Sequence, residues 1–248
     1  MRYSIPALIA LTLSGSVLAD ASLDIWWHGK PQPPMAFKKD ILLSQALKQV
    51  ALSESIYWPT AQISTADRQQ KVLQFKEQVL VELATLANWA QQAGRPALVA
   101  SVENLKLQLS ELSVTGRFEV PVDPDILRAS GIKDPLLQGA YQLFLAPRHA
   151  ELTVFGLTES KTIPMVPGML LRDYWKSLTL DEDAEPAHVY LIDTNGQSHR
   201  VPVAIWNAER REPAPGAALY VGFDIASLPA EFTPINDHVL TLLANRMP

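Results

Sequence analysis

The sequence predicts an α+β protein with two short strand-rich units, a helical hairpin inserted into the first unit, and an amphipathic helix at the C-terminus. Residues 65–114 carry apolar residues at steps of three and four, the spacing that places side chains on one face of a helix. The chain on either side alternates short apolar runs with Gly, Pro and Asn, which is typical of strands and turns. With residues 65–114 set aside, residues 22–148 leave a unit about as long as residues 151–229. Both units follow the order strand, return strand, helix, further strands and closing strand, which indicates an internal repeat.

Residues 1–21 have the features of a signal peptide. Arg2 gives a short positive start, residues 5–13 form an apolar core, and small residues lead to a cleavage site near Ala19 or Ala21. The alternative, a transmembrane anchor, is disfavoured because the apolar run is well short of the ~20 residues that span a bilayer. The sequence therefore predicts an exported protein of the bacterial periplasm with no transmembrane span in its mature form. The absence of Cys fits that compartment, where stray thiols become oxidised.

The first unit, residues 22–148, begins with a predicted strand at residues 23–27 that contains Trp26 and Trp27. Successive side chains on a strand point to opposite faces, so the two indoles cannot both enter one core. Either each packs against a different element, or one of them faces solvent, a ligand or the hairpin. Both are therefore candidate binding residues. Further along, Asp40 is expected to cap a short helix.

The inserted segment, residues 65–114, is expected to form two amphipathic helices. Thr65 offers a capping side chain, Gly94 suits the left-handed position after a helix, and Pro96 suits the first turn of the next helix. The two apolar stripes bury only part of each other, so we expect the hairpin to dock on the second unit. The stripes consist of Val72, Phe75, Val79, Leu83, Leu86 and Ala90, followed by Leu98, Val102, Leu105, Leu109 and Leu112.

Arg117 lies where the hairpin rejoins the first unit. Phe118 and Val120 alternate with Arg117 and Glu119, as on a half-buried strand. Because three bodies of the protein can meet at this point, a guanidinium here is placed to bind carboxylates or backbone carbonyls in fixed geometry. The alternative is an exposed strand arginine. Arg117 is therefore the third candidate binding residue.

The second unit, residues 149–229, repeats the strand-rich pattern. Its clearest signal is Asn195-Gly196 between two apolar runs, a pair that favours a two-residue type I′ turn in a β-hairpin. Its other predicted elements are a strand at 152–156, a return strand at 161–165, a helix at 169–175 and a closing strand at 219–223.

The C-terminal segment, residues 230–248, predicts a short amphipathic helix from Thr233 to Met247. A membrane-surface helix usually carries several Lys or Arg residues and an aromatic residue, whereas Arg246 is the only Lys or Arg here and residues 235–248 contain no aromatic side chain. We therefore expect the helix to pack on the second unit, beside the hairpin. Its apolar stripe consists of Ile235, Val239, Leu242, Leu243 and Met247.

Few residues indicate catalysis or metal binding. The five His residues are scattered, and no zinc-helix, nucleophile-elbow or phosphate-loop motif occurs. The absence of Cys excludes disulfides, thiolate metal sites and a cysteine nucleophile. The formal net charge is -5 with no basic block, which disfavours nucleic acid as a partner. We therefore expect no catalytic residue, no bound metal and no cofactor.

The order of these motifs resembles the GfcC family of capsule-assembly proteins. The resemblance rests on the signal peptide, the hairpin inside the first unit, the Thr-Gly-Arg-Phe segment at 115–118 and the terminal helix. The second unit, with Val154-Phe155-Gly156, Pro167-Gly168 and residues 216–222, is similar to the soluble-ligand-binding β-grasp modules of Wza-type polysaccharide exporters. The chain departs from those exporters because it lacks a lipid-bearing Cys and has a shorter final helix.

This resemblance implies tandem β-grasp (ubiquitin-like) domains, a periplasmic location and a role in capsule or exopolysaccharide assembly or export. Its implied partners are the polysaccharide or outer-membrane export proteins, and it implies no catalytic residues. Arg117 matches the central arginine of the family. Two function classes stay open: a non-enzymatic binding factor, which we favour, and a periplasmic polysaccharide-modifying enzyme that uses Asp123, Asp125 or Glu119 as acids.

Overall fold

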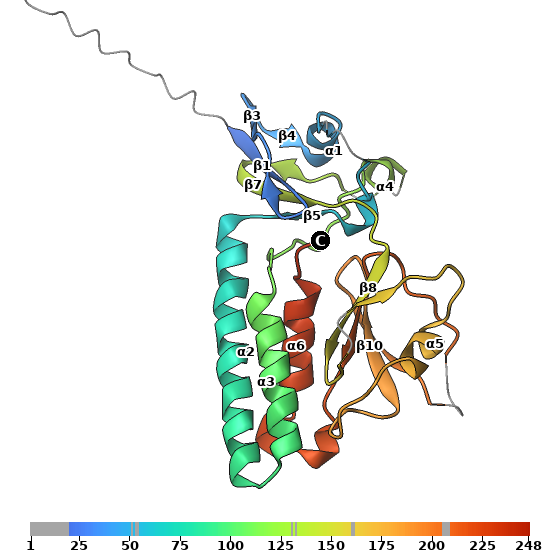
Figure 1. Cartoon of the computed structure of the whole chain (residues 1–248). Helices are drawn as coiled ribbons and strands as arrows, with labels where there is room; N and C mark the ends of the chain where they lie inside the picture. The colour runs from blue at the N-terminus through green and yellow to red at the C-terminus, as the bar shows by residue number, and fades with distance from the viewer. Residues whose placement is uncertain are drawn as a thin grey trace, which may run out of the picture.

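The computed structural model describes residues 20–50, 52, 55–129, 131, 133–159, 162–204 and 209–248. The protein is α+β, as the sequence predicts, with a mixed sheet in each half of the chain and a layer of long helices. In Figure 1 the first sheet lies at one end of the molecule, and the helices α2, α3 and α6 lie side by side next to the second sheet. Most of the predicted signal peptide, residues 1–19, lies outside the described residues.

The first sheet is built around a parallel pair of strands. β1 (Ala21–Trp27) pairs in parallel with β7 (Gly139–Leu145), and β7 pairs antiparallel with β5 (Gln62–Ser64). On its other side β1 pairs antiparallel with β2 (Lys30–Pro31) and β3 (Met35–Phe37). The first residue of β1, Ala21, is buried.

The helices α1 (Leu43–Leu47) and α4 (Pro124–Ala129), the 3-10 turn η1 (Trp58–Thr60) and a two-stranded ladder of β4 (Ile41–Leu42) with β6 (Leu136–Leu137) complete the first unit. The alternation of β1 places Leu23, Ile25 and Trp27 against this core. The expected Asp40 cap is wrong: Leu42 is the N-cap of α1 without a side-chain bond, and Asp40 accepts a hydrogen bond from Gln138 instead.

The second sheet repeats the arrangement of the first. β8 (Glu151–Gly156) lies between its antiparallel return strand β9 (Thr162–Pro164) and the parallel last strand β12 (Ala218–Val221). β10 (His188–Ile192) and β11 (Ser198–Pro202) continue the sheet beyond β12 in antiparallel pairings, and α5 (Leu171–Lys176) follows β9 in the chain. In both sheets the first strand therefore lies between its return strand and a parallel last strand, while the finer assignment of both units as β-grasp domains stays a prediction.

The turn between β10 and β11 is a hairpin turn, but its type differs from the prediction. A type I′ turn needs positive φ at both central residues, whereas Gly196 alone has positive φ here, at 86°. Gly196 N donates to Asp193 O at 3.0 Å, and Asp193 N donates to Gln197 O at 2.8 Å. This pattern is a type I turn followed by a left-handed glycine, the usual form of a three-residue loop.

The predicted helical hairpin is confirmed. It consists of α2 (Ala66–Gln92) and α3 (Pro96–Glu111), with Gly94 at a φ of 68° between them. Thr65 Oγ1 accepts a hydrogen bond from Arg68 N at 3.4 Å and so caps α2. At the tip of the hairpin, Arg95 forms an ion pair with Asp183 of the second unit.

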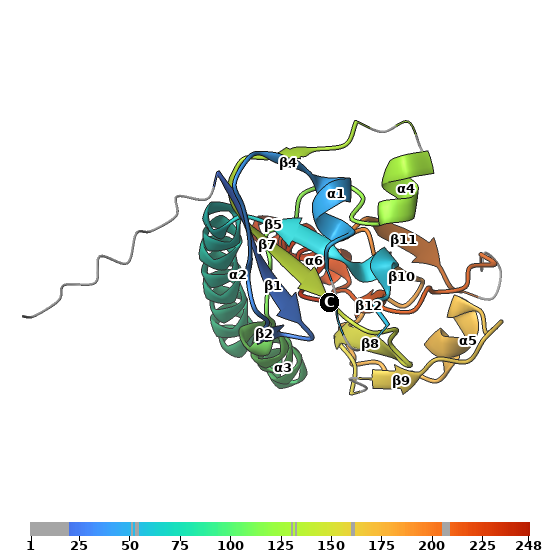
Figure 2. The same ribbon diagram turned by 90° about the horizontal axis from the view of Figure 1, so that it is seen from above.

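The hairpin, the second sheet and α6 (Ile235–Ala244) share one hydrophobic core, as predicted. The predicted stripe residues Ile235, Val239, Leu242 and Leu243 are fully buried, but the helix ends at Ala244 and does not include Met247. Short turns η2 (Ile225–Ser227) and η3 (Ala230–Phe232) lead into α6. Seen from above in Figure 2, the first sheet lies over α6, and α2 and α3 lie beside it.

A buried side-chain amide fastens α6 to the second sheet. Asn236 Oδ1 accepts hydrogen bonds from Tyr220 Oη at 2.9 Å and Phe223 N at 3.0 Å, while its Nδ2 donates to Phe223 O at 3.0 Å. On the other face of α6, His238 Nδ1 lies 2.7 Å from Glu82 Oε2 on α2. Across the part of the chain that the structure describes, no helix is both long and apolar enough to cross a membrane.

Candidate functional site

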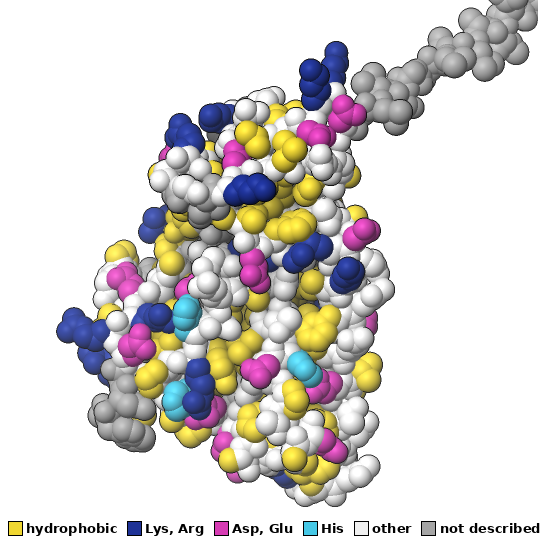
Figure 3. All heavy atoms as spheres, turned by 180° about the vertical axis from the view of Figure 1, so that it is seen from behind, with side chains coloured by type: hydrophobic (Ala, Val, Ile, Leu, Met, Phe, Trp, Pro, Cys, Tyr) yellow, Lys and Arg dark blue, Asp and Glu magenta, His cyan; other side chains and the backbone are white. Residues whose placement is uncertain are grey.

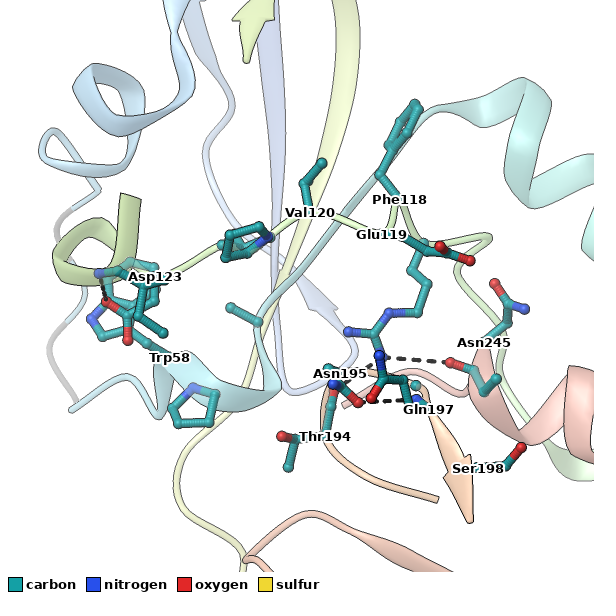
Figure 4. A pocket seen from close by; sticks show the side chains of 18 of the residues that line it. Trp58, Phe118, Glu119, Val120, Asp123, Thr194, Asn195, Gln197, Ser198 and Asn245 are labelled. Atoms are coloured by element: carbon teal, nitrogen blue, oxygen red, sulfur yellow. Dashed lines mark hydrogen bonds between the residues drawn. The ribbon is translucent and has the colours of Figure 1, made fainter. Parts of the chain in front are cut away.

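A cleft of about 820 Å³ lies where the two units and the end of α6 meet. Figure 4 shows side chains from the first unit and from the β10–β11 turn lining it from different sides. On the face of the molecule shown in Figure 3, Lys and Arg side chains are interspersed with Asp and Glu side chains. The cleft is lined by Trp58, Pro59, Ala61, Arg68, Arg117, Phe118, Glu119, Val120, Pro121, Val122, Asp123, Ile126, Thr194, Asn195, Gly196, Gln197, Ser198, His199, Ala244 and Asn245.

The chain that returns from the hairpin is fixed against the start of α2. Gly116, at a φ of 66°, approaches α2 so closely that a Cβ atom would lie 2.5 Å from the backbone carbon of Arg68. Its carbonyl accepts hydrogen bonds from Ser64 Oγ at 2.7 Å and from Arg68 Nε at 3.1 Å. Phe118 N then donates to Ile63 O of β5 at 2.9 Å, although residues 117–120 do not form the predicted strand. This anchoring determines where the next side chain, that of Arg117, enters the junction.

Arg117 joins the first unit to the second unit and to α6. Only 9% of the residue is exposed, and its Nη1 donates to Thr194 O at 3.0 Å and to Ala244 O at 3.5 Å. Burial lowers the pKa of Arg117 to about 10, against a smaller upward effect of Glu119, so the guanidinium stays charged at neutral pH. The predicted pairing of Arg117 with backbone carbonyls at a junction is therefore confirmed, while its role in binding stays a prediction.

Arg246 is a second cation at this junction, partly buried, and the sequence did not predict it as a site residue. Its Nη2 donates to Gly216 O at 2.6 Å and to Ile192 O at 3.4 Å, and its Nη1 donates to Leu243 O at 2.9 Å. The pKa of Arg246 is lowered to about 10, chiefly by burial and then by the charge of Arg117, while the charge of Asp193 acts in the opposite direction. Both guanidiniums thus sit at the C-terminal carbonyls of α6, where the helix dipole favours positive charge.

The two predicted tryptophans lie on opposite faces of β1. Trp27 packs against the core of the first unit, whereas Trp26 stacks on Phe144 with ring centroids 6.2 Å apart. Neither lines the cleft, so the structure does not bring them together with Arg117. Their role in binding stays a prediction.

The three acidic candidates differ in their surroundings. Asp123 Oδ1 accepts hydrogen bonds from Asp125 N at 2.8 Å and Ile126 N at 3.3 Å, and so holds the start of α4. Asp125 is exposed, pairs with Arg128 and does not line the cleft. Glu119 is exposed and lines the cleft. Within the described ranges, no three His, Asp or Glu side chains are grouped as metal ligands.

His149 lies at a second contact between the units, close to His28. The two imidazole centroids are 6.4 Å apart, and a Cβ atom on Gly216 would lie 3.4 Å from His149 Cδ2. The pKa of His149 is lowered from 6.5, chiefly by burial and then by the charges of His28 and Arg246. Below about pH 6.5 the imidazole of His149 therefore binds a proton more readily in the unfolded chain than in the folded protein.

We expect the stability of the protein to fall between pH 7 and pH 5, and His149→Gln to reduce that fall, because the variant has no imidazole to protonate at this contact. The free energy of unfolding, measured by urea titration at several pH values, tests this expectation. His188→Gln is the control, since His188 lies on β10 beside Glu185. An equal pH dependence in wild type and His149→Gln would contradict it.

Comparison with known proteins links both halves of the chain to capsule biosynthesis. A family model described as "Capsule biosynthesis GfcC, N-terminal" matches residues 19–148, and one described as "Capsule biosynthesis GfcC C-terminal" matches residues 159–248. The chain is also similar to the uncharacterized protein YjbG of Escherichia coli (strain K12), with 28% identity over 249 residues. That alignment covers 100% of this chain and 99% of YjbG.

Proposed function

Because the chain belongs to the GfcC family of capsule biosynthesis proteins, we propose that it is a non-enzymatic periplasmic factor that holds polysaccharide in the cleft around Arg117. Family membership supports the capsule role and capsule-related partners. The cleft is the feature of this chain that supports polysaccharide as the ligand.

The observation that carries the proposal is the chemical difference between the two walls of the cleft. The first unit contributes a mainly apolar wall, and the β10–β11 turn contributes a wall of hydroxyl, amide and imidazole groups. A sugar ring has apolar C–H faces and a polar rim, so its two aspects match these two walls. The apolar wall includes Trp58, Pro59, Val120, Pro121 and Ile126, and the polar wall includes Thr194, Asn195, Gln197, Ser198 and His199.

The placement of the carboxylates supports binding over catalysis. Glycoside hydrolysis commonly uses two carboxyl groups that face each other across the scissile bond, about 5 to 9.5 Å apart. Asp123 is engaged in holding α4, and Asp125 is paired outside the cleft. Of the three acidic candidates, Glu119 alone lines the cleft without such a hydrogen bond or ion pair, so it has no second carboxylate as a catalytic partner among these three.

The start of β1 supports export with signal-peptide cleavage after Ala19. Ala21 is buried and pairs with both Phe37 and Gly139, and Asp20 O accepts a hydrogen bond from Gly139 N at 2.9 Å. Cleavage after Ala21 would remove these contacts. We expect the intact mass of the protein recovered from the periplasm to match a chain that begins at Asp20, and a chain that begins at Ser22 would contradict this.

We expect Ser198→Trp to abolish complementation of a gene deletion, because an indole at this exposed position of β11 fills the cleft without entering a core. Surface polysaccharide, measured by staining of the complemented strain, is the readout. Gln70→Trp, at an exposed position of α2 outside the cleft, is the matched control and should restore the wild-type level. Full complementation by a stably folded Ser198→Trp protein would overturn the role of the cleft. Shortening of purified capsule polysaccharide by the pure protein would overturn its non-enzymatic character.

A further inference from the structure

We propose that the cleft selects glycans that carry carboxylate groups, with Arg117 as the residue that recognises the carboxylate. This inference rests on the proposed polysaccharide-binding function and specifies the class of sugar. It follows from the unused hydrogen-bond donors of Arg117 and from the charges around it.

One edge of the Arg117 guanidinium has no partner. Both hydrogen bonds of this side chain to described residues come from Nη1, and Nε is buried without an acceptor. Nη2 forms no hydrogen bond to a described residue and, unlike Nε, is not among the buried atoms without a partner. Nη2 is therefore the donor that a carboxylate in the cleft can reach. A hydrogen bond between a guanidinium and a carboxylate is charge-assisted, and is stronger than a bond between neutral groups.

The charge of Arg117 also lacks a partner. Among the described residues, neither Arg117 nor Arg246 forms an ion pair with a carboxylate, and both bind only backbone carbonyls. The charge of Asp193 raises the pKa of Arg246, but the Asp193 carboxylate lies 2.8 Å from His199 Nε2 and forms no ion pair with Arg246. The charge of Arg117 lowers the pKa of Arg246, so an anion at this junction stabilises the neighbouring positive charges.

The remaining groups of the cleft favour a glycan carboxylate over a peptide carboxylate. The apolar wall and the amide-rich wall match the faces and hydroxyls of a sugar ring, as described above. Glu119 is exposed at the cleft and repels an anionic ligand, although solvent screens such exposed charges. Removing that charge should therefore strengthen the binding of an acidic sugar.

The test measures binding of trigalacturonic acid and of its fully methyl-esterified form to the full mature protein by calorimetry. These probes differ only in the methyl groups that neutralise the carboxylates. We expect the ester to bind at least about tenfold more weakly, because a charge-assisted hydrogen bond is replaced by a neutral contact. Arg117→Lys, checked for folding by its melting temperature, should weaken this preference, since an ammonium lacks the planar guanidinium that bonds two carbonyls through Nη1 while Nη2 stays available. Glu119→Gln should bind the acid more tightly, and Arg200→Gln, on β11 outside the cleft, should behave as wild type.

Equal binding of acid and ester would overturn the carboxylate selectivity and leave the proposed polysaccharide-binding function intact. Binding of neither probe, or equal binding of triglutamate, would also overturn the selectivity for acidic glycans. Failure of the proposed function is recognised separately, by full complementation with Ser198→Trp.

Discussion

Gly156→Ala is expected to lower the free energy of unfolding by at least about 3 kcal/mol and to reduce the yield of folded protein. Gly156 ends β8 at a φ of 103°, a conformation that side chains rarely adopt. A Cβ atom here would overlap Val221 O and lie 2.8 Å from the Val221 carbonyl carbon, so the clash is with the backbone of β12. Backbone strain and overpacking each cost about 1–3 kcal/mol, and neither can relax without separating the two parallel strands.

The position also connects the second sheet to the hairpin. Gln108 on α3 accepts a hydrogen bond from Gly156 N at 2.9 Å and donates to Gly156 O at 3.3 Å. Gly168→Ala is the matched control, because Gly168 has a φ of 77° but no atom within 4 Å of the added Cβ. Gly168→Ala should lower the free energy of unfolding by only about 1–2 kcal/mol. Urea unfolding of both variants tests the difference, and equal losses would show that close packing at Gly156 is unimportant.

Asn236→Ala is expected to lower the free energy of unfolding by about 3 kcal/mol and to loosen α6. The change leaves Tyr220 Oη, Phe223 N and Phe223 O without partners in a buried setting, and each such group costs about 1–3 kcal/mol. For a domain of this size the melting temperature should fall by roughly 6–12 °C.

Hydrogen exchange distinguishes a local from a general effect of this variant. Amides of residues 239–243 should exchange faster relative to those of β10, because the lost bonds tie α6 to the sheet. Asn245→Ala is the control, since Asn245 Nδ2 makes one exposed bond to Thr241 O within the same helical segment. Unchanged protection of α6 in Asn236→Ala would show that apolar packing alone holds the helix.

The helices were the most predictable part of the fold. The stripes of α2, α3 and α6 follow the 3.6-residue period, and Thr65, Gly94 and Pro96 mark their ends by local chemistry. Features decided by distant partners were not predictable in this way. Asp40 bonds to Gln138 across the β4–β6 ladder instead of capping α1, and Met247 leaves the helical stripe to donate its N–H to Ser113 O.

The candidate site was only partly predictable for the same reason. Arg117 could be placed at a junction because it follows the return of the hairpin. Arg246 looked like an ordinary basic residue of the terminal helix, and the Asn195-Gly196 signal predicted a hairpin without indicating what that turn would face. The contribution of both to the junction depends on how the two units pack, which local sequence patterns do not encode.

The pairing of the last residues with the segment after α3 has a consequence for biosynthesis. Thr115 N donates to Asn245 O at 2.9 Å, Met247 N donates to Ser113 O at 2.8 Å, and Gln62 Nε2 donates to Arg246 O at 2.9 Å. The wall near Arg117 therefore requires residues that are far apart in the chain and that are synthesised after both sheets. Contacts between such distant positions form slowly. We expect a chain without residues 245–247 to lack a complete cleft, so that ligand binding becomes possible only after these residues have been added and have paired with the segment after α3.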